Sequence, residues 1–308
     1  MTPATLTGLA IGDALGMPFE MVPHGDDRLR TWKGDFVSGR NSPYTRDLAP
    51  GQWTDDTKMA VQLAHSLRHE QTYSPVDASR RYLAWFHSGD LRGIGKATRQ
   101  ALTRLEMNLP WTQSGGAGAE GNGTAMRVAP LGLFFRHNIQ AALEMAAIDA
   151  RITHNSLEAE VGSMAVAGGV AALLQGATPE DLAYRIYDLL PPSRVRDGIF
   201  AMRDIGSDHR EDVLACKIAN MGVRAHVVQT VPAAFAAFAA TTNFHDAVRV
   251  AILAGGDTDT TAAITGALAG TYYGAAQVEP FMAQLEDAEG LREVELSLYE
   301  DAPAPSPV

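Results

Sequence analysis

Three stretches of the sequence are apolar around nearly the whole circumference of a helix and are rich in small residues. They are VGSMAVAGGVAALLQG at 161–176, VPAAFAAFAATT at 231–242 and TAAITGALAGTYYG at 261–274. A helix without a polar face is buried on all sides, and small side chains let neighbouring helix backbones approach closely. A further stretch, TKMAVQLAHSLRHE at 57–70, has the apolar spacing of an amphipathic helix. These patterns predict four helices, three of them in the core.

Strand signals are few in the same chain. We find no sustained alternation of β-branched and aromatic residues, and no Asn-Gly hairpin between two such runs. The sequence therefore predicts an all-α protein. Hydrophobic residues make up 46% of the 308 residues, which is enough for a sizeable core. Because no convincing linker divides the chain, we expect a single domain over residues 1–300 and a flexible tail at 301–308.

Charge and cysteine content narrow the classes of partner and compartment. The formal net charge is -11, from 25 Lys and Arg against 36 Asp and Glu, which argues against broad contact with a nucleic-acid backbone. A phosphorylated small molecule stays open, because backbone N–H groups or metal ions can hold one. The single cysteine, Cys216, excludes an intrachain disulfide and a thiolate zinc site. With neither a signal peptide nor a run of roughly 20 apolar residues, the chain is expected to be a cytoplasmic monomer without membrane association.

Two acidic motifs stand at the starts of predicted helices, GQWTDDTKMA at 51–60 and AGGDTDTTAA at 254–263. They contain Thr54, Asp55, Asp56, Asp257, Asp259 and Thr260. Each motif alone is compatible with helix capping, since Asp and Thr side chains accept hydrogen bonds from free N–H groups. If the two helix starts meet, however, their carboxylates repel one another unless cations are present. Such hard oxygen donors favour Mg²⁺, Mn²⁺ or Ca²⁺, and four aspartates can hold two ions roughly 3.5–4 Å apart.

The segment GLAIGDALGMPFE at 8–20 combines small and acidic residues. Gly8, Gly12 and Gly16 recur on one helix face, and this spacing predicts close packing against another helix. Asp13 lies inside the same helix and Glu20 at its end. Glu20 is a candidate fifth metal ligand or a general acid/base, and a plain surface position is the alternative.

A glycine-rich loop and a histidine complete the candidates. The loop GAEGNGTAMR at 118–127 contains Gly121, Asn122 and Gly123 and offers backbone N–H groups to phosphate oxygens, although such loops often have no ligand. His154 in RITHNSLEAE is a possible ligand contact, and a packed or capping histidine is the more common case.

Taken together, these motifs resemble the ADP-ribosylglycohydrolase family. GDALGMPFE, TDDTKMA, GNGTAMRVAP, THNSLEAEVGSMAVA, VPAAFAAF and AGGDTDTTAAITGALAGTYYG occur in the order typical of that family, from about residue 8 to 274. The resemblance implies a compact all-α orthogonal helical bundle with two Mg²⁺ or Mn²⁺ ions in a central cleft. The implied ligands are Thr54, Asp55 and Asp56 for one ion, Asp257 and Thr260 for the other, Asp259 as the bridge, and Glu20 beside the second ion.

The resemblance also implies a reaction. The family's substrates are ADP-ribose units joined through C1″ of the distal ribose to an acceptor, on a protein side chain such as arginine or serine or in a small adduct. Gly121, Asn122 and Gly123 match a loop beside the diphosphate and distal ribose, and His154 matches a ligand-contacting histidine. We hypothesise that the ions orient the ribose hydroxyls and activate water. Glu20, Asp55 and Asp56 are the expected catalytic residues, with Glu20 or Asp56 managing the proton.

One departure from the family pattern concerns the acceptor. Many arginine-directed members have an Asp where the segment GDLRGIGKATRQAL has Gly93. Asp90 is a candidate to take over its role in substrate binding. Two alternatives to the hydrolase stay open, a non-catalytic ADP-ribose-binding or crystallin-like structural member and a hydrolase of another nucleotide-sugar adduct.

Overall fold

A computed structural model describes residues 2–300 of the protein, apart from 43–44, 46, 204 and 206–209. The described chain is 68% helical, with 17 α-helices, and this confirms the all-α prediction. The expected tail at 301–308 lies outside the described residues, and the single domain over 1–300 stays a prediction.

Most helices and strands follow one another with short connections, and the longest stretch between two α-helices runs from Thr31 to Asp55. The helices are α1 (Thr5–Gly16), α2 (Asp27–Thr31), α3 (Asp55–Glu70), α4 (Pro75–Ser88), α5 (Lys96–Glu106), α6 (Trp111–Ser114), α7 (Ala129–Phe134), α8 (Ile139–Arg151), α9 (Leu157–Leu174), α10 (Pro179–Leu189), α11 (Arg194–Met202), α12 (Glu211–Ala219), α13 (Val227–Ala239), α14 (Phe244–Leu253), α15 (Thr258–Tyr273), α16 (Ala275–Met282) and α17 (Ala288–Glu300). Three 3₁₀ turns, η1 (Met17–Phe19), η2 (Gly39–Asn41) and η3 (Ala125–Arg127), and four short strands, β1 (Val22–Pro23), β2 (Gly116–Ala117), β3 (His154–Asn155) and β4 (Gly255–Gly256), lie between them.

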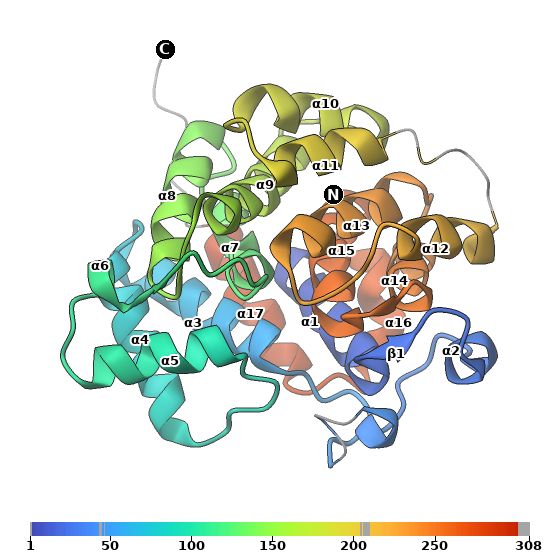
Figure 1. Ribbon diagram of the computed structural model, residues 1–308, viewed down its shortest axis with the longest axis horizontal. Helices are drawn as coiled ribbons and strands as arrows, with labels where there is room; N and C mark the ends of the chain where they lie inside the picture. Colours follow the sequence, from blue (N-terminus) through green and yellow to red (C-terminus); the bar gives the residue numbers. More distant parts are fainter. Residues whose placement is uncertain (1, 43–44, 46, 204, 206–209, 301–308) are drawn as a thin grey trace.

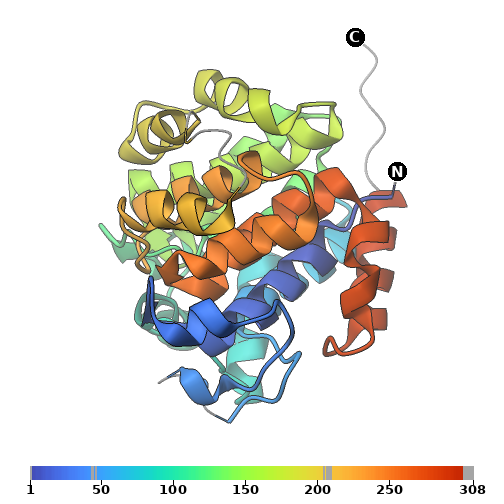
Figure 2. The same ribbon diagram turned by 90° about the vertical axis from the view of Figure 1, so that its right-hand side faces the viewer.

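Helices α1 and α15 lie side by side in the middle of the fold (Figures 1 and 2). A Cβ atom added at Gly8 would collide with the backbone oxygen of Gly266, and one at Gly12 with that of Ala262. The contacts run in opposite directions along the two helices, so the pair is antiparallel. The packing that the glycine spacing predicts is therefore confirmed. It brings the C-terminal end of α1 to the N-terminal end of α15.

The four predicted helices are present, but they begin earlier than the apolar pattern indicated. Helix α15 starts at Thr258 rather than near Thr261, α13 at Val227, and α3 at Asp55. The acidic motifs therefore lie at the first turns of their helices. Each helix extends beyond its apolar residues, because Asp and Thr are well tolerated at a helix start. Helix α9 is long and apolar enough to cross a membrane by length and composition alone, but 78% of it is buried inside the protein, as is typical of a core helix.

The short strands hold together segments that are distant in the sequence. β1 pairs antiparallel with β4, and β2 pairs parallel with β3. The β4 glycines, Gly255 and Gly256, have φ angles of 72° and 79°, a left-handed conformation that glycine adopts without strain. The first pairing joins the segment after Glu20 to the start of α15, and the second joins the glycine-rich loop to His154.

Candidate functional site

The first acidic motif forms the beginning of α3. Thr54 is the N-cap residue but makes no side-chain capping hydrogen bond, and Asp55 and Asp56 lie in the first turn. The cap comes from another helix. The Thr54 N–H donates to Asp13 Oδ2 at 2.9 Å, and the Thr57 N–H donates to the same atom at 3.1 Å. Capping, the alternative explanation of this motif, is therefore carried by Asp13 of α1.

The second acidic motif forms the beginning of α15. Asp257 is the N-cap residue, again without a side-chain capping bond. Its own backbone is anchored twice, because its N–H donates to Val223 O at 3.1 Å and its carbonyl accepts from Thr261 Oγ1 at 2.6 Å. The Met21 N–H donates to Gly256 O at 2.6 Å. This contact brings the segment that carries Glu20 beside the start of α15.

The two motifs meet at a cavity of about 310 Å³. Its wall includes Glu20, Asp55, Asp56, Asp257, Asp259 and Thr260, together with Gly121, Asn122, Gly123 and His154. Thr54 lies behind this wall, with Oγ1 3.5 Å from Asp56 Oδ2. Asp90 does not line the cavity. A larger cavity, of about 460 Å³ and bordered by His24, Arg30 and Arg249, contains none of the predicted site residues.

The cavity concentrates negative charge away from water. Burial raises the pKa of Asp55, Asp56 and Asp259 well above the usual value, and neighbouring carboxylates raise it further. Burial, followed by the charge of Asp257, raises the pKa of Glu20 to about 7. Ionised carboxylates this close together are stable only with compensating positive charge.

Two of the carboxylate oxygens have no partner within the protein. Glu20 Oε2 and Asp56 Oδ1 are buried without a hydrogen bond in the part of the chain that the structure describes. An unpaired buried oxygen is costly, and Lys96, the one Lys or Arg among the described cavity-lining residues, has an exposed side chain. Hard oxygen donors with free lone pairs are the donor set that Mg²⁺ and Mn²⁺ prefer.

The glycine-rich loop lies directly against His154. A Cβ atom at Gly121 would lie 2.9 Å from His154 Nε2, and one at Gly123 would lie 3.1 Å from His154 Cε1. The ring is buried and its Nδ1 lies 2.9 Å from Thr153 Oγ1. Burial and the charge of Arg127 lower the pKa of His154 to about 3. A neutral imidazole therefore faces the cavity.

Asn122 is turned toward the acidic motif rather than left free. Its Nδ2 donates to Asp257 Oδ2 at 2.7 Å and to Thr230 Oγ1 at 3.0 Å. Both amide protons are thereby used inside the protein, so only Oδ1 is available to a ligand. Asn122 therefore links the glycine-rich loop to Asp257.

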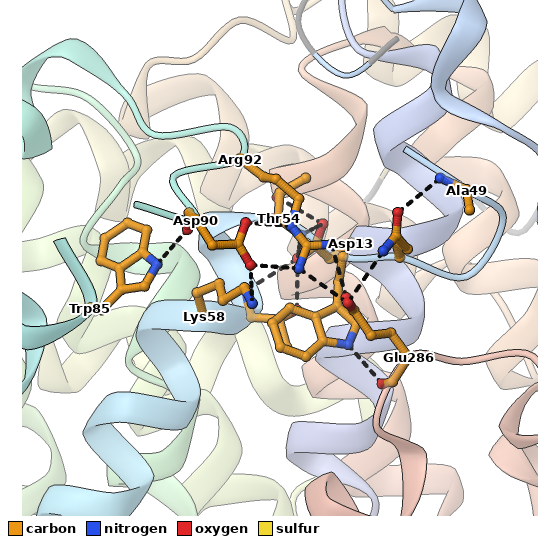
Figure 3. Close-up of polar contacts among 11 residues, drawn as sticks. Asp13, Ala49, Thr54, Lys58, Trp85, Asp90, Arg92 and Glu286 are labelled. Atoms are coloured by element: carbon orange, nitrogen blue, oxygen red, sulfur yellow. Dashed lines mark hydrogen bonds and ion pairs between the residues drawn. The ribbon is translucent and has the colours of Figure 1, made fainter. Parts of the chain in front are cut away.

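Asp90 lies in a network of paired charges outside the cavity (Figure 3). Arg92 donates to both of its carboxylate oxygens, at 2.8 and 2.9 Å, and Lys58 Nζ lies 2.7 Å from Asp90 Oδ2. Arg92 also donates to both oxygens of Glu286. Through these contacts the pKa of Asp90 falls to about 2, with the hydrogen bond from Arg92 as the largest cause. The structure thus does not bring Asp90 to the site, and its part in substrate binding stays a prediction.

Gly93 does line the cavity, next to Asp55. Its φ angle is 78°, and a Cβ atom there would collide with Asp55 Oδ1. A side chain at position 93 would therefore be strained and would displace a predicted metal ligand. The missing Asp of arginine-directed members has no room in this backbone conformation.

Sequence reasoning missed two residues that hold the site together. Asp13 was noticed but given no role, and Arg127, inside the GNGTAMR motif, was not considered. Arg127 is fully buried and donates to Gly123 O at 3.0 Å and to Thr153 Oγ1 at 2.8 Å, so it positions the loop and the residue before His154. An arginine at the end of a glycine-rich motif was the available signal.

Comparisons with known proteins identify the family and the fold of the chain. The sequence profile of the ADP-ribosylglycohydrolase family matches residues 3–307. The chain is 30% identical to ADP-ribosylarginine hydrolase Tri1 of Pseudomonas putida, over 97% of this chain and 77% of that protein. It is 27% identical to ADP-ribosyl-[dinitrogen reductase] glycohydrolase of Rhodospirillum rubrum, over 87% and 83%. A solved structure described as an ADP-ribosylglycohydrolase-related protein complex superposes with a TM-score of 0.77 at 32% identity, covering 97% of each chain.

Proposed function

Because the chain belongs to the ADP-ribosylglycohydrolase family, we propose that it is a metal-dependent hydrolase that releases ADP-ribose from an acceptor. The bond cleaved is the one that joins C1″ of the distal ribose to the acceptor atom. The observation that carries this proposal is the convergence of five carboxylates on one cavity, two of them with unpaired buried oxygens.

The proposed cofactor is a pair of Mg²⁺ or Mn²⁺ ions. The residues that would hold them are Thr54, Asp55 and Asp56 on one side, Asp257 and Thr260 on the other, Asp259 between the two, and Glu20 beside the second. Ions bound there would supply the positive charge that orients the ribose hydroxyls and polarises water.

The protein's own groups have separate tasks in this mechanism. Backbone N–H groups of Gly121 and Gly123 face the diphosphate, where such groups hold phosphate oxygens well. His154, neutral and buried, offers a hydrogen bond without adding charge. Glu20 or Asp56 exchanges the proton of the attacking water. Asp55 would hold one of the ions.

The acceptor is proposed only as a class, an ADP-ribosylated protein side chain or a small ADP-ribose adduct. The named relatives are hydrolases of ADP-ribosylarginine and of ADP-ribosyl-dinitrogen reductase. Gly93, by contrast, leaves no room for the acidic group of arginine-directed members. A cytoplasmic, monomeric protein without nucleic-acid or membrane contact remains part of the proposal.

The test is a release assay with Mg²⁺ or Mn²⁺ on three substrates, ADP-ribosylated arginine, ADP-ribosylated serine and an ester of ADP-ribose. Asp55→Asn is the test variant. Asp77→Asn is the matched control, because Asp77 also lies buried in a first helical turn but is paired with Arg80 and Arg81. We expect metal-dependent release by the wild type and by the control, and none by Asp55→Asn. Tight ADP-ribose binding without release from any substrate would instead identify a non-catalytic binding protein.

A further inference from the structure

We propose that Asp13 is a positioning residue for one half of the metal centre. It fixes the beginning of α3 so that Asp55 and Asp56 line the cavity, with Asp56 Oδ1 left without a hydrogen-bond partner among the described residues. This inference rests on the proposed metal centre. It gives a role to an acidic residue that lies outside the cavity wall.

The contacts of Asp13 use up its carboxylate. Oδ1 accepts from Thr54 Oγ1 at 2.8 Å and from the Thr54 N–H at 3.1 Å. Oδ2 accepts from the Thr54 N–H at 2.9 Å, from the Thr57 N–H at 3.1 Å and from Thr57 Oγ1 at 2.6 Å. The side chain is completely buried toward the C-terminal end of α1 and is seen next to Thr54 in Figure 3. Asp13 is therefore not itself a ligand, since four donor groups already surround it.

Through these contacts Asp13 caps the first turn of α3. The free N–H groups at a helix start normally take a side chain of the same segment as acceptor. Here Asp13 fills that role from another helix by accepting from the Thr54 and Thr57 N–H groups, so Asp56 is not needed as a cap. Asp56 Oδ1 is left without any partner.

Thr54 is oriented by the same carboxylate. Its hydroxyl donates its single proton to Asp13, so the lone pairs of Oγ1 point to the other side, where Asp56 Oδ2 lies 3.5 Å away. A hydroxyl oxygen in this orientation has lone pairs available to coordinate a cation. Without Asp13, the proton would be free to turn toward Asp56 and to occupy the ligand position.

The second half of the centre has its own supports. Thr258 Oγ1 donates to Gly16 O at 2.8 Å, Asn122 donates to Asp257, and the Asp257 N–H donates to Val223 O. None of these contacts involves Asp13. A change at Asp13 should therefore affect one of two ions far more than the other.

Glu295 provides a matched control at the opposite end of the same helix. This residue of α17 is 3% exposed and caps the beginning of α1, accepting from the Leu6 N–H at 2.8 Å and from Thr7 Oγ1 at 2.6 Å. It is a buried carboxylate that caps a helix start from another helix, as Asp13 is, but it does not line the cavity. Loss of a cap costs stability in both places, and only Asp13 adjoins predicted ligands.

The experiment is a calorimetric titration of the full chain with Mn²⁺ alone, for wild type, Asp13→Asn and Glu295→Gln. For the wild type we expect two bound ions. Because partners that orient metal ligands typically contribute about 10- to 100-fold in affinity, Asp13→Asn should weaken one ion by that factor and the other by less than about threefold. Glu295→Gln should keep both affinities.

The outcomes separate the positioning role from the centre itself. A wild type that binds no Mn²⁺ contradicts the proposed metal centre. A wild type with two ions whose affinities survive Asp13→Asn overturns the role of Asp13, as does equal weakening of both ions in Asp13→Asn and Glu295→Gln. Should Asp13→Asn fail to fold, Thr57→Val and Thr57→Ser repeat the test. The serine keeps the hydroxyl donor to Asp13, so we expect only the valine to weaken that ion, and identical behaviour of the two contradicts the proposal.

Discussion

Two buried clusters of ionisable residues lie on neighbouring segments of this protein, and they differ in whether their charges are paired within the protein. Arg127 and Asp149 form an ion pair at 2.7 Å with both side chains fully buried. Tyr73 and Tyr82 donate to Asp149 Oδ1, and the remaining guanidinium nitrogens of Arg127 donate to Gly123 O, Thr153 Oγ1 and Asp149 O. Every charge of this cluster has a partner within the protein.

The acidic cavity has no such balance. Among the described residues, its five carboxylates include two oxygens without hydrogen-bond partners, and its one lining Lys or Arg, Lys96, is exposed to solvent. A buried charge that is paired and hydrogen-bonded belongs to the architecture, whereas buried charges left unpaired indicate a ligand that brings the opposite charge. The contrast locates the candidate site more sharply than cavity volume, because the larger cavity contains none of these carboxylates.

The largest effect expected from this contrast follows from Asp259→Asn. In the cavity, loss of Asp259, the predicted bridging ligand, should reduce the proposed ADP-ribose release by at least about 10³-fold, since residues that only orient metal ligands typically contribute about 10- to 100-fold. Without divalent cations, however, the variant should unfold at a higher temperature than the wild type, because one of the mutually repelling carboxylates is gone. A thermal melt in a chelator measures this, and a lower melting temperature would mean that the carboxylates are already balanced by the protein.

In the Arg127–Asp149 cluster, removing one charge should lower the stability of the protein instead of raising it. Arg127→Met leaves Asp149 buried without its cation, so we expect the free energy of unfolding to fall by about 3–5 kcal/mol. Urea unfolding measures this loss. The double change Arg127→Met/Asp149→Leu removes both charges and should be more stable than Arg127→Met alone. If the double change loses as much as the sum of the single ones, the pair is not acting as a unit.

Glu295 sharpens the comparison because it is hydrogen-bonded but forms no ion pair with the residues that the structure describes. Burial raises its pKa from the usual 4.5 to about 7, so the folded chain binds this proton more tightly than the unfolded chain. Its contribution to stability is therefore fully present below pH 4.5 and is lost as the pH rises through 7. Over that window the wild type should lose about 3 kcal/mol relative to Glu295→Gln, at roughly 1.4 kcal/mol per pKa unit. The difference between the two urea-unfolding curves isolates Glu295, because the cavity carboxylates titrate in both. Parallel curves would show that Glu295 is ionised in the folded chain throughout.

Local patterns in the sequence were enough to predict α1, α3, α9, α13 and α15 and the acidic motifs, but not the other helices of the described chain. The glycines at every fourth position from Gly8 indicated a close helix contact, because that property depends only on spacing within one helix. Asp55 and Asp259 were recognised as candidate ligands because each motif is a short segment at a helix start. Their binding of metal stays a prediction, while their approach to one cavity is seen in the structure.

Contacts between distant segments were beyond the reach of these patterns. The donors to Asp13 stand 41 and 44 positions away, and Asn122 donates to a residue 135 positions away. Asn122 was assigned to the substrate, because nothing in its own loop shows that its amide protons are used by Asp257. The sequence likewise suggested Asp90 for substrate binding, and only the fold shows that Arg92 and Lys58 pair with it.

The smallest effect concerns a third kind of cluster, the paired charges of Figure 3, which are complete but lie partly in solvent. Glu286 is 28% exposed and accepts two hydrogen bonds from Arg92 at 3.0 and 3.1 Å. Because water already solvates both partners, Glu286→Gln should lower the free energy of unfolding by only about 0.5 kcal/mol, and by less at high salt. Urea unfolding at two salt concentrations measures this, with the release assay as a parallel readout that should not change. If Glu286→Gln instead lowers the free energy of unfolding by nearly as much as Arg127→Met, pairing of charges matters more for stability than their burial. The two buried clusters would then differ only in whether their charges are balanced.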